Sequence, residues 1–335
     1  MKMINKLIIL FGWILLAGCS NPLPDSGGEE QIDEGEPIDL SFDLYSAVVT
    51  KADNKTTVTM ASGCVFRIYA YKAGETDLSK PVASAEYTVG DAGKATGNLS
   101  LYRGKYDFYL ISNNTNIAPK LDDGSNAVTV DNGNDFMYNI ISNEVIQPES
   151  PGQNTMTVKL RTAFVRLGAS IDLSVKAKSN SPIAVTGLKV QSITIKYLSS
   201  RLSYELGEKD WNTTVAPSYE KTNAFTVNEF TTAKPIDPHN NTKPVVLLPV
   251  DGKTDLLFEL VLNVTYIKYE DGSGQGTQVS SDFTYEASAT KALIKGMKYK
   301  FEFTLTFFGI LTPGDITVSL LDYTQEDLST DQVGE

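Results

Sequence analysis

The feature that most limits the fold of this chain is a period-two alternation of apolar and polar residues. It is clearest at residues 38–45, where Ile38, Leu40, Phe42 and Leu44 alternate with mostly polar residues. Successive side chains of a β-strand point to opposite faces, so such a segment has one face for a core and one for water. No segment has the apolar spacing of an amphipathic helix. The sequence therefore predicts an all-β protein.

Segments of this kind recur along the chain, separated by Gly, Pro, Asn and Asp. The predicted strands are 38–52, 65–71, 83–89, 97–101, 105–112, 127–130, 136–145, 155–160, 164–175, 188–198, 224–230, 245–250, 256–269, 277–285, 298–307 and 316–321. Turn-forming residues between 119 and 153 indicate a domain boundary. We therefore expect an N-terminal β-sandwich over residues 38–151, and a C-terminal β-sandwich with an acidic tail over residues 152–335.

The N-terminus, residues 1–19, has the organisation of a lipoprotein signal. Lys2 and Lys6 precede an apolar run, 7–16, that is too short to span a bilayer. The run ends at Leu16-Ala17-Gly18-Cys19, which resembles a bacterial lipobox. That resemblance implies lipidation of Cys19 and anchoring in the outer membrane, because several acyl chains hold a protein stably. The alternative is an ordinary cleaved signal with an incidental cysteine.

Residues 20–37 carry Pro, Gly and acidic residues, with no Lys or Arg. Low hydrophobicity and like charge predict a flexible acidic tether. An acidic stretch after a lipidated cysteine also resembles the export signals of surface-exposed lipoproteins, and a plain solvated linker is the alternative. The net charge of −12 argues against nucleic acid as a partner, because phosphate binding needs a basic face.

A short turn motif occurs once in each half. Gly104 precedes Tyr106, and Gly296 precedes Tyr299, each time between two predicted strands. Glycine supplies the positive φ that such a turn needs, and the tyrosine can bury its ring while its hydroxyl bonds nearby backbone. The repeat favours two sandwiches of related topology.

Residues with catalytic or metal-binding chemistry are few. His239 is the only histidine, too few for a zinc site, and is expected in a loop. Cys64 is expected to be a small buried residue. The acidic segments 122–124 and 131–135 lack EF-hand spacing and are better explained as turns. Four aromatic residues were considered as a glycan platform or, more simply, as packing on a sheet face: Tyr69, Tyr71, Tyr109 and Trp211. We expect no enzyme activity, no metal and no cofactor.

Several of these features together resemble the fimbrillin family of type V pilus subunits, tips and anchors. They are the lipobox, the acidic tether, and the segments 49–52, 63–71, 101–110, 296–306, 316–318 and 322–323. The resemblance implies two transthyretin-like Greek-key β-sandwich domains in tandem. It also implies assembly by donor-strand exchange, in which a protease cuts after a basic residue, usually arginine, behind the first strand. Here no arginine lies between Cys19 and Cys64, and Lys51 stands at the expected cleavage position.

The resemblance assigns roles to two strands. Leu40, Phe42 and Leu44 belong to the strand whose loss would open an acceptor groove, and Ile316, Val318 and Leu320 belong to a candidate donor strand. Alternatively, both strands simply complete their own domains. The expected function is that of a structural or adhesive component of a fimbrium at the cell surface. Its partners would be other fimbrial subunits and host or bacterial surface ligands or glycans. A glycan-binding lipoprotein associated with polysaccharide uptake is the alternative function.

Overall fold

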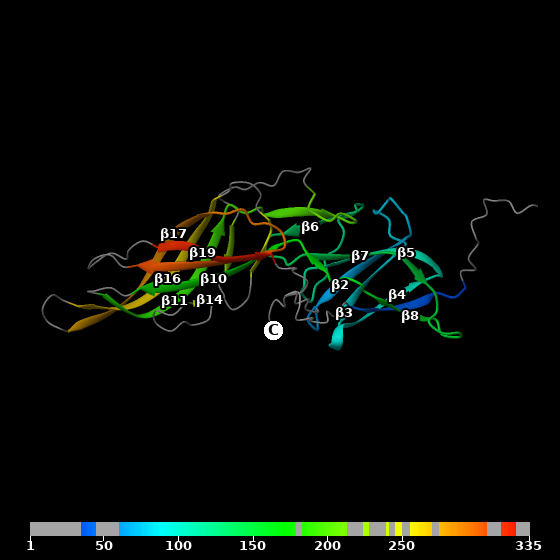
Figure 1. Cartoon of the computed structure of the whole chain (residues 1–335), viewed down its shortest axis with the longest axis horizontal. Helices are drawn as coiled ribbons and strands as arrows, with labels where there is room; N and C mark the ends of the chain where they lie inside the picture. The colour runs from blue at the N-terminus through cyan, green and yellow to red at the C-terminus, as the bar shows by residue number, and fades with distance from the viewer. Residues whose placement is uncertain are drawn as a thin grey trace, which may run out of the picture. The chain divides into compact units, whose positions relative to one another are not determined.

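The computed structural model describes residues 35–44, 60–178, 183–212, 224–227, 239–240, 245–249, 255–269, 275–306 and 316–325. Within these ranges the regular structure is β-strand, apart from one short 3₁₀ turn at Asp91–Gly93 (Figure 1). The part of the chain described contains no helix long and apolar enough to cross a membrane. The predicted all-β fold is confirmed.

The first half of the chain forms one eight-stranded sheet. Its strands, in spatial order, are β8 (Thr155–Lys159), β1 (Ile38–Asp43), β4 (Lys94–Leu101), β3 (Ala83–Val89), β2 (Val65–Lys72), β5 (Gly104–Ser112), β7 (Met137–Ile146) and β9 (Val165–Arg166). Strands β2, β3 and β4 form a meander and β5 returns beside β2, which is the Greek-key order. Of the predicted strand 38–52 the structure shows Ile38–Asp43, and residues 45–52 lie outside the described part of the chain.

This sheet curls over its own core. Only Tyr102 and Arg103 separate β4 from β5, although two strands lie between them in the sheet. Likewise, residues 160–164 alone connect the two edge strands β8 and β9. Such short connections can be made only if the sheet rolls up, because an extended residue spans at most about 3.5 Å. The rolled sheet encloses a buried apolar cluster drawn from seven of its strands.

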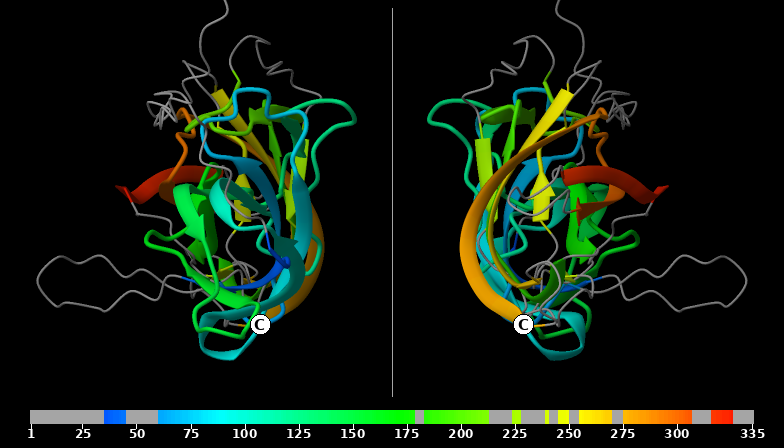
Figure 2. Two further views of the ribbon diagram at one scale, coloured as in Figure 1. Left: turned by 90° about the vertical axis from the view of Figure 1, so that its right-hand side faces the viewer. Right: turned by 90° about the vertical axis from the view of Figure 1, so that its left-hand side faces the viewer.

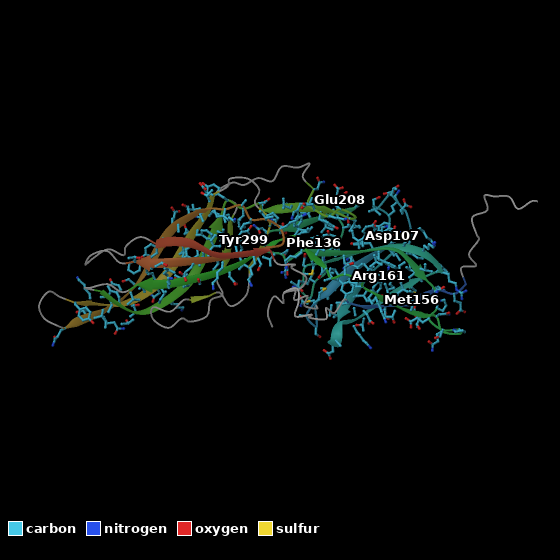
Figure 3. The ribbon with its side chains drawn as sticks, viewed as in Figure 1. Asp107, Phe136, Met156, Arg161, Glu208 and Tyr299 are labelled. Carbon is cyan, nitrogen blue, oxygen red and sulfur yellow. The ribbon has the colours of Figure 1, made fainter. Side chains whose placement is uncertain are left out.

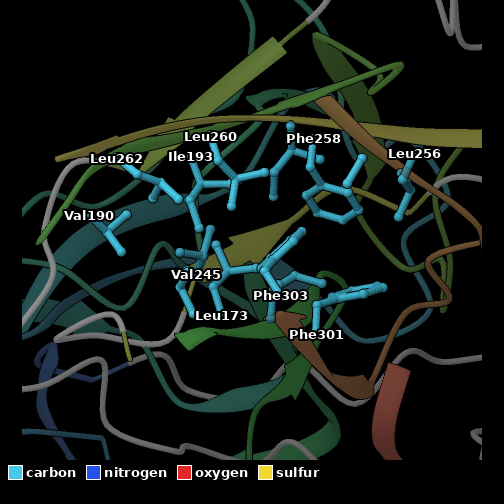
Figure 4. Packing of buried hydrophobic residues seen from close by; sticks show 14 of the residues in the cluster. Leu173, Val190, Ile193, Val245, Leu256, Phe258, Leu260, Leu262, Phe301 and Phe303 are labelled. Atoms are coloured by element: carbon cyan, nitrogen blue, oxygen red, sulfur yellow. The ribbon is translucent and has the colours of Figure 1, made fainter. Parts of the chain in front are cut away.

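The second half is a sandwich of two sheets. One sheet contains β14 (His239–Asn240), β10 (Ala169–Lys178), β18 (Met297–Thr306) and β19 (Ile316–Gln325), with β15 (Val245–Leu247) also paired to β10. The other contains β13 (Ala224–Val227), β11 (Ile183–Lys196), β16 (Asp255–Tyr269) and β17 (Gly276–Thr290). Figure 4 shows Leu173, Phe301 and Phe303 of the first sheet facing Ile193, Phe258 and Leu260 of the second. Figure 2 shows how strongly the long strands curve along this core.

A third buried cluster, rich in aromatic side chains, packs on the other face of the eight-stranded sheet. It contains Tyr69 and Tyr71 of β2, together with side chains of a separate two-stranded sheet, β6 (Ala127–Asp131) with β12 (Arg201–Glu205). Strand β12 was not predicted from the sequence, since only two of its five residues, Leu202 and Tyr204, are apolar. Because both faces of β2 are covered, its burial pattern lacks the alternation of a half-exposed strand.

The N-terminal sheet extends past the expected boundary between residues 151 and 152. Strand β8 pairs with β1, and β9 pairs with β7, so the eight-stranded sheet continues to Arg166. The predicted strand 164–175 is in fact two strands, β9 and β10, which belong to different sheets and flank Gly168. The division into two domains stays a prediction, whereas the N-terminal sheet ends later than the composition indicated.

The two Gly–Tyr turns differ in detail. Both glycines have positive φ, 69° at Gly296 and 156° at Gly104, and both tyrosine rings are buried. The Tyr299 hydroxyl donates to the Ala292 carbonyl and accepts from the Ile294 amide, each at 3.1 Å. The Tyr106 hydroxyl instead accepts a 2.8 Å hydrogen bond from Lys72 Nζ. The predicted backbone-bonded tyrosine is thus confirmed in the second half and replaced by a side-chain contact in the first.

Replacing Gly296 by alanine is expected to lower the free energy of unfolding by about 1 kcal/mol, because a Cβ atom is strained at φ 69°. Gly152 has φ 82° in an exposed turn, so Gly152→Ala gives the cost of the same backbone strain at a position without the tyrosine. Denaturant titration of both variants measures the difference. A Gly296→Ala protein as stable as the parent would contradict the assignment of a strained, positive-φ turn at Gly296.

Candidate functional site

The candidate site is β1 and the slot that holds it. This strand is the first that the structure describes, and it lies inside the sheet rather than at an edge. It pairs antiparallel with β4, from Ile38 opposite Leu101 to Asp43 opposite Lys94. On its other side it pairs parallel with β8, from Asp39 opposite Thr155 to Asp43 opposite Lys159. Its backbone is therefore hydrogen-bonded along both sides.

The inward face of β1 fills the core of the rolled sheet. Leu40 and Phe42 are 3% and 0% exposed, and Leu44 directly after the strand is 8% exposed. The Phe42 ring meets Tyr87 edge to face, with centroids 5.0 Å apart, and Phe108 at 5.7 Å. Burying three apolar side chains of this size stabilises the fold by roughly 1.5–3 kcal/mol each. The three predicted groove residues thus act together as one buried row.

Polar groups fix the register of β1. The Tyr87 hydroxyl donates a 2.6 Å hydrogen bond to the Leu40 carbonyl from within the core, and burial raises the pKa of Tyr87 to about 12. On the outer face, Ser100 Oγ donates to the Asp39 carboxylate, and Ser41 Oγ donates to Thr157 Oγ1 at 3.1 Å. A one-residue slip would break these bonds and turn the apolar row outward.

Strand β8 depends on β1. Among the described strands its only ladder partner is β1, so losing β1 would leave β8 without a place in the sheet and expose the edge of β4. The open side of β8 is covered in part by Glu149, whose carboxylate accepts a 2.6 Å hydrogen bond from the Thr157 amide. The sequence predicted this strand but assigned it to the second domain. Its parallel partner lies more than one hundred residues earlier, so no local pattern could have indicated the pairing.

The candidate donor residues lie in β19, at the edge of a different sheet. Ile316, Val318 and Leu320 pair with Leu305, Phe303 and Phe301 of β18. Those three partners are fully buried. In this chain β19 therefore completes its own sheet, and the structure does not bring it to β1. Cys19 and Lys51 lie outside the described residues, as do the signal 1–19 and most of the tether 20–37.

The aromatic residues considered as a glycan platform are packed inside the protein. Tyr69, Tyr71 and Trp211 are at most 7% exposed, and Tyr109 is half-buried against them. Tyr71 Oη donates to the Leu78 carbonyl at 2.6 Å, and Trp211 Nε1 donates to the Leu167 carbonyl at 2.9 Å. The simpler interpretation, packing on a sheet face, is confirmed for these residues.

The other candidate residues have structural surroundings as well. Cys64 is buried next to β2, where its Sγ lies 3.5 Å from Asn114 Oδ1 and burial raises the pKa of the thiol. Asp122 accepts a hydrogen bond from Thr129 Oγ1 at 2.8 Å within a turn. His239, expected in a loop, lies in the short strand β14 opposite Val175. Within the described ranges no three His, Cys, Asp or Glu residues are grouped as metal ligands.

A buried ion pair was missed by sequence reasoning. The Arg166 guanidinium donates two hydrogen bonds to the Asp135 carboxylate, one of them from a terminal nitrogen at 2.7 Å. The two side chains are only 1% and 5% exposed, and Asn114 Nδ2 also donates to Asp135 at 3.0 Å. An arginine near the start of the apolar predicted strand 164–175 was the available signal. The pair joins β9 to the loop that precedes β7.

Comparison with solved structures identifies the same fold elsewhere. A candidate cell adhesion protein from Bacteroides fragilis has 14% identity and a TM-score of 0.53, over 86% of this chain and 97% of that chain. A fimbrial protein from Bacteroides vulgatus has the same identity and TM-score, over 86% of this chain and 99% of that chain. At this identity the similarity shows the fold alone. No curated protein sequence gives a significant match.

The sequence itself provides the family. Residues 92–301, more than half of the chain, match the family profile described as fimbrillin-like. The matched region begins just before β4 and runs into β18, so it includes strands of all the sheets described above. This protein belongs to the fimbrillin-like family.

Proposed function

We propose that this protein is a surface lipoprotein that acts as an anchor, accessory or tip subunit of a type V-like fimbrium assembled by donor-strand exchange. The observation that carries the proposal is the position of β1. It is the first strand among the described residues of a fimbrillin-like chain, and it fills an interior slot with a continuous apolar row. Removing an interior strand exposes both a hydrophobic groove and unpaired backbone groups, which is the surface that strand addition requires.

The sequence outside the described residues supports the cellular location. The lipobox ending at Cys19 and the acidic tether 20–37 fit a chain held at the outer membrane and facing outward. A fimbrial and adhesive family gives no reason to expect enzyme activity, and we propose none. The partners in this proposal are other fimbrial subunits, with host or bacterial surface molecules as adhesion ligands.

N-terminal sequencing of the protein from sheared surface material tests the assembly step. A mature start at Ala52 would identify a polymerised subunit cut after Lys51. A blocked, lipidated Cys19 in fimbrial material would identify an anchor or accessory subunit that keeps β1. Absence of the chain from all polymeric surface fractions would contradict the proposal.

Replacing Cys19 by alanine tests the anchor. Because only acyl chains are proposed to hold the protein, the Cys19→Ala form is expected to leave the outer-membrane fraction and to keep its signal. The matched control is Cys64→Ala, since Cys64 is buried and free of any disulfide. Cell fractionation with a high-salt wash measures the distribution. A Cys19→Ala protein that remains in the washed membrane would show that the anchor lies elsewhere.

A further inference from the structure

We propose that residues 155–166, from β8 through β9, form a strap that must open before β1 can leave its slot, and that Asn139 and the Asp135–Arg166 pair hold this strap closed. The inference rests on the proposed function, since it concerns the control of strand exchange. Met156 and Arg161, both labelled in Figure 3, mark the strap on the molecule.

The topology makes the strap a cover for β1. Strand β1 lies between β4 and β8, and β8 forms the outer edge of the sheet. While β8 is in place, β1 can leave only by breaking both ladders in one step. Once β8 has opened, a single ladder to β4 remains. Dividing the opening into two smaller steps lowers its barrier, so the stability of the strap sets the rate at which β1 is released.

The strap is attached along its length. Directly after β8, the Leu160 amide donates to the Asp43 carbonyl at 2.9 Å, which joins the strap to the end of β1. Its inward side chains, Val158 and Leu160, are 0% and 5% exposed. Phe164 packs edge to face on Phe66 with centroids 5.7 Å apart. These contacts belong to the shared core, so they would be lost together with the strap.

Two polar attachments of the strap come from buried side chains. Asn139, only 3% exposed in β7, donates through Nδ2 to the Thr162 carbonyl at 2.8 Å and the Ala163 carbonyl at 2.9 Å. Farther along, Arg166 is held by Asp135. Thr162 is exposed and Ala163 is half-buried, so removing the Asn139 amide deletes two hydrogen bonds that tie this part of the closed strap to β7. The open strap makes neither bond, so the substitution weakens the closed state alone and favours opening.

Hydrogen exchange on the purified full chain tests the proposal without requiring a fimbrium. In Asn139→Ala, amides of residues 38–44 and 155–160 are expected to exchange about tenfold faster or more, whereas amides of β2 and β5 in the same sheet keep the parent rate. The control is Arg161→Ala, which changes a strap residue that is 82% exposed and whose 3.5 Å ion pair with Glu144 is expected to contribute little. Equal acceleration of β1, β2 and β5 would mean general destabilisation and would overturn the proposal, as would an unchanged rate in β1.

A locked strap gives a second test that does not depend on a destabilised variant. Ser41 and Thr157 face each other on the outer surface of β1 and β8, with hydroxyl oxygens 3.1 Å apart. A Ser41→Cys and Thr157→Cys disulfide is expected to slow exchange in residues 38–44 at least tenfold relative to its reduced form. Identical exchange rates in the oxidised and reduced forms would overturn the proposal that the strap controls the release of β1. N-terminal sequencing tests the proposed function separately, so the two failures can be told apart.

Discussion

Replacing Phe42 by alanine is expected to lower the free energy of unfolding by about 3–5 kcal/mol, the usual cost of removing a buried phenylalanine. Phe42 is fully buried and lies within 6 Å of two other rings, Tyr87 and Phe108, in edge-to-face geometry. Such aromatic pairs add to the loss, because alanine removes both edge-to-face contacts. Guanidinium titration followed by fluorescence or circular dichroism measures the change.

The matched control for Phe42→Ala is Ser41→Ala in the same strand. Ser41 is on the exposed face, where substitutions usually change stability by less than about 0.5 kcal/mol. A Phe42→Ala protein that loses no more than Ser41→Ala would show that β1 contributes little to the core. In that case the slot left by β1 would not be an apolar groove, and the acceptor-strand proposal would lose its main support.

Replacing Asp135 by alanine is expected to cost about 3–5 kcal/mol, because the Arg166 guanidinium would remain buried without its carboxylate. The two side chains are almost completely excluded from solvent. Asn114 would lose an acceptor as well, which adds the cost of another unsatisfied polar group. Denaturant titration measures the loss, and calorimetry checks that unfolding of the variant is still cooperative.

The double variant Asp135→Leu with Arg166→Met separates charge burial from packing. When both charges are replaced by apolar groups of similar size, the cost of burying the arginine without the Asp135 carboxylate disappears. The double variant is therefore expected to be more stable than Asp135→Ala. If the double variant and Asp135→Ala lose equal stability, the loss does not come from the broken ion pair. It then comes from the packing of β9. Exposed Lys80, 3.7 Å from Asp77, offers a surface pair whose loss should be nearly silent.

Strand identity could be predicted from the sequence wherever one face of a strand meets the core and the other meets water. Segment 83–89 matches β3 at both ends, and 65–71 matches β2 to within one residue. The apolar row of β1 was likewise visible as alternation. These features are local, since they depend only on side-chain spacing along one strand.

The pairing of strands that lie far apart in the chain could not be predicted, because it depends on contacts between distant segments. The parallel pairing of β8 with β1 and the Asp135–Arg166 pair join segments with no shared local pattern. For the same reason the sequence did not indicate that the N-terminal sheet continues to Arg166. A stretch rich in Gly, Pro, Asn and Asp around residues 119–153 marks turns, and here the chain turns and then returns to the first sheet.

The double pairing of β1 also determines how this strand would respond to mechanical load. A force applied at Ile38 along the strand acts at right angles to most of its ladder hydrogen bonds, because antiparallel bonds run across the strand direction. The ladders to β4 and β8 are then sheared together rather than peeled apart one bond at a time. Tension on the N-terminal side would thus be shared across the whole strand, which suits a protein that must resist pulling at a cell surface.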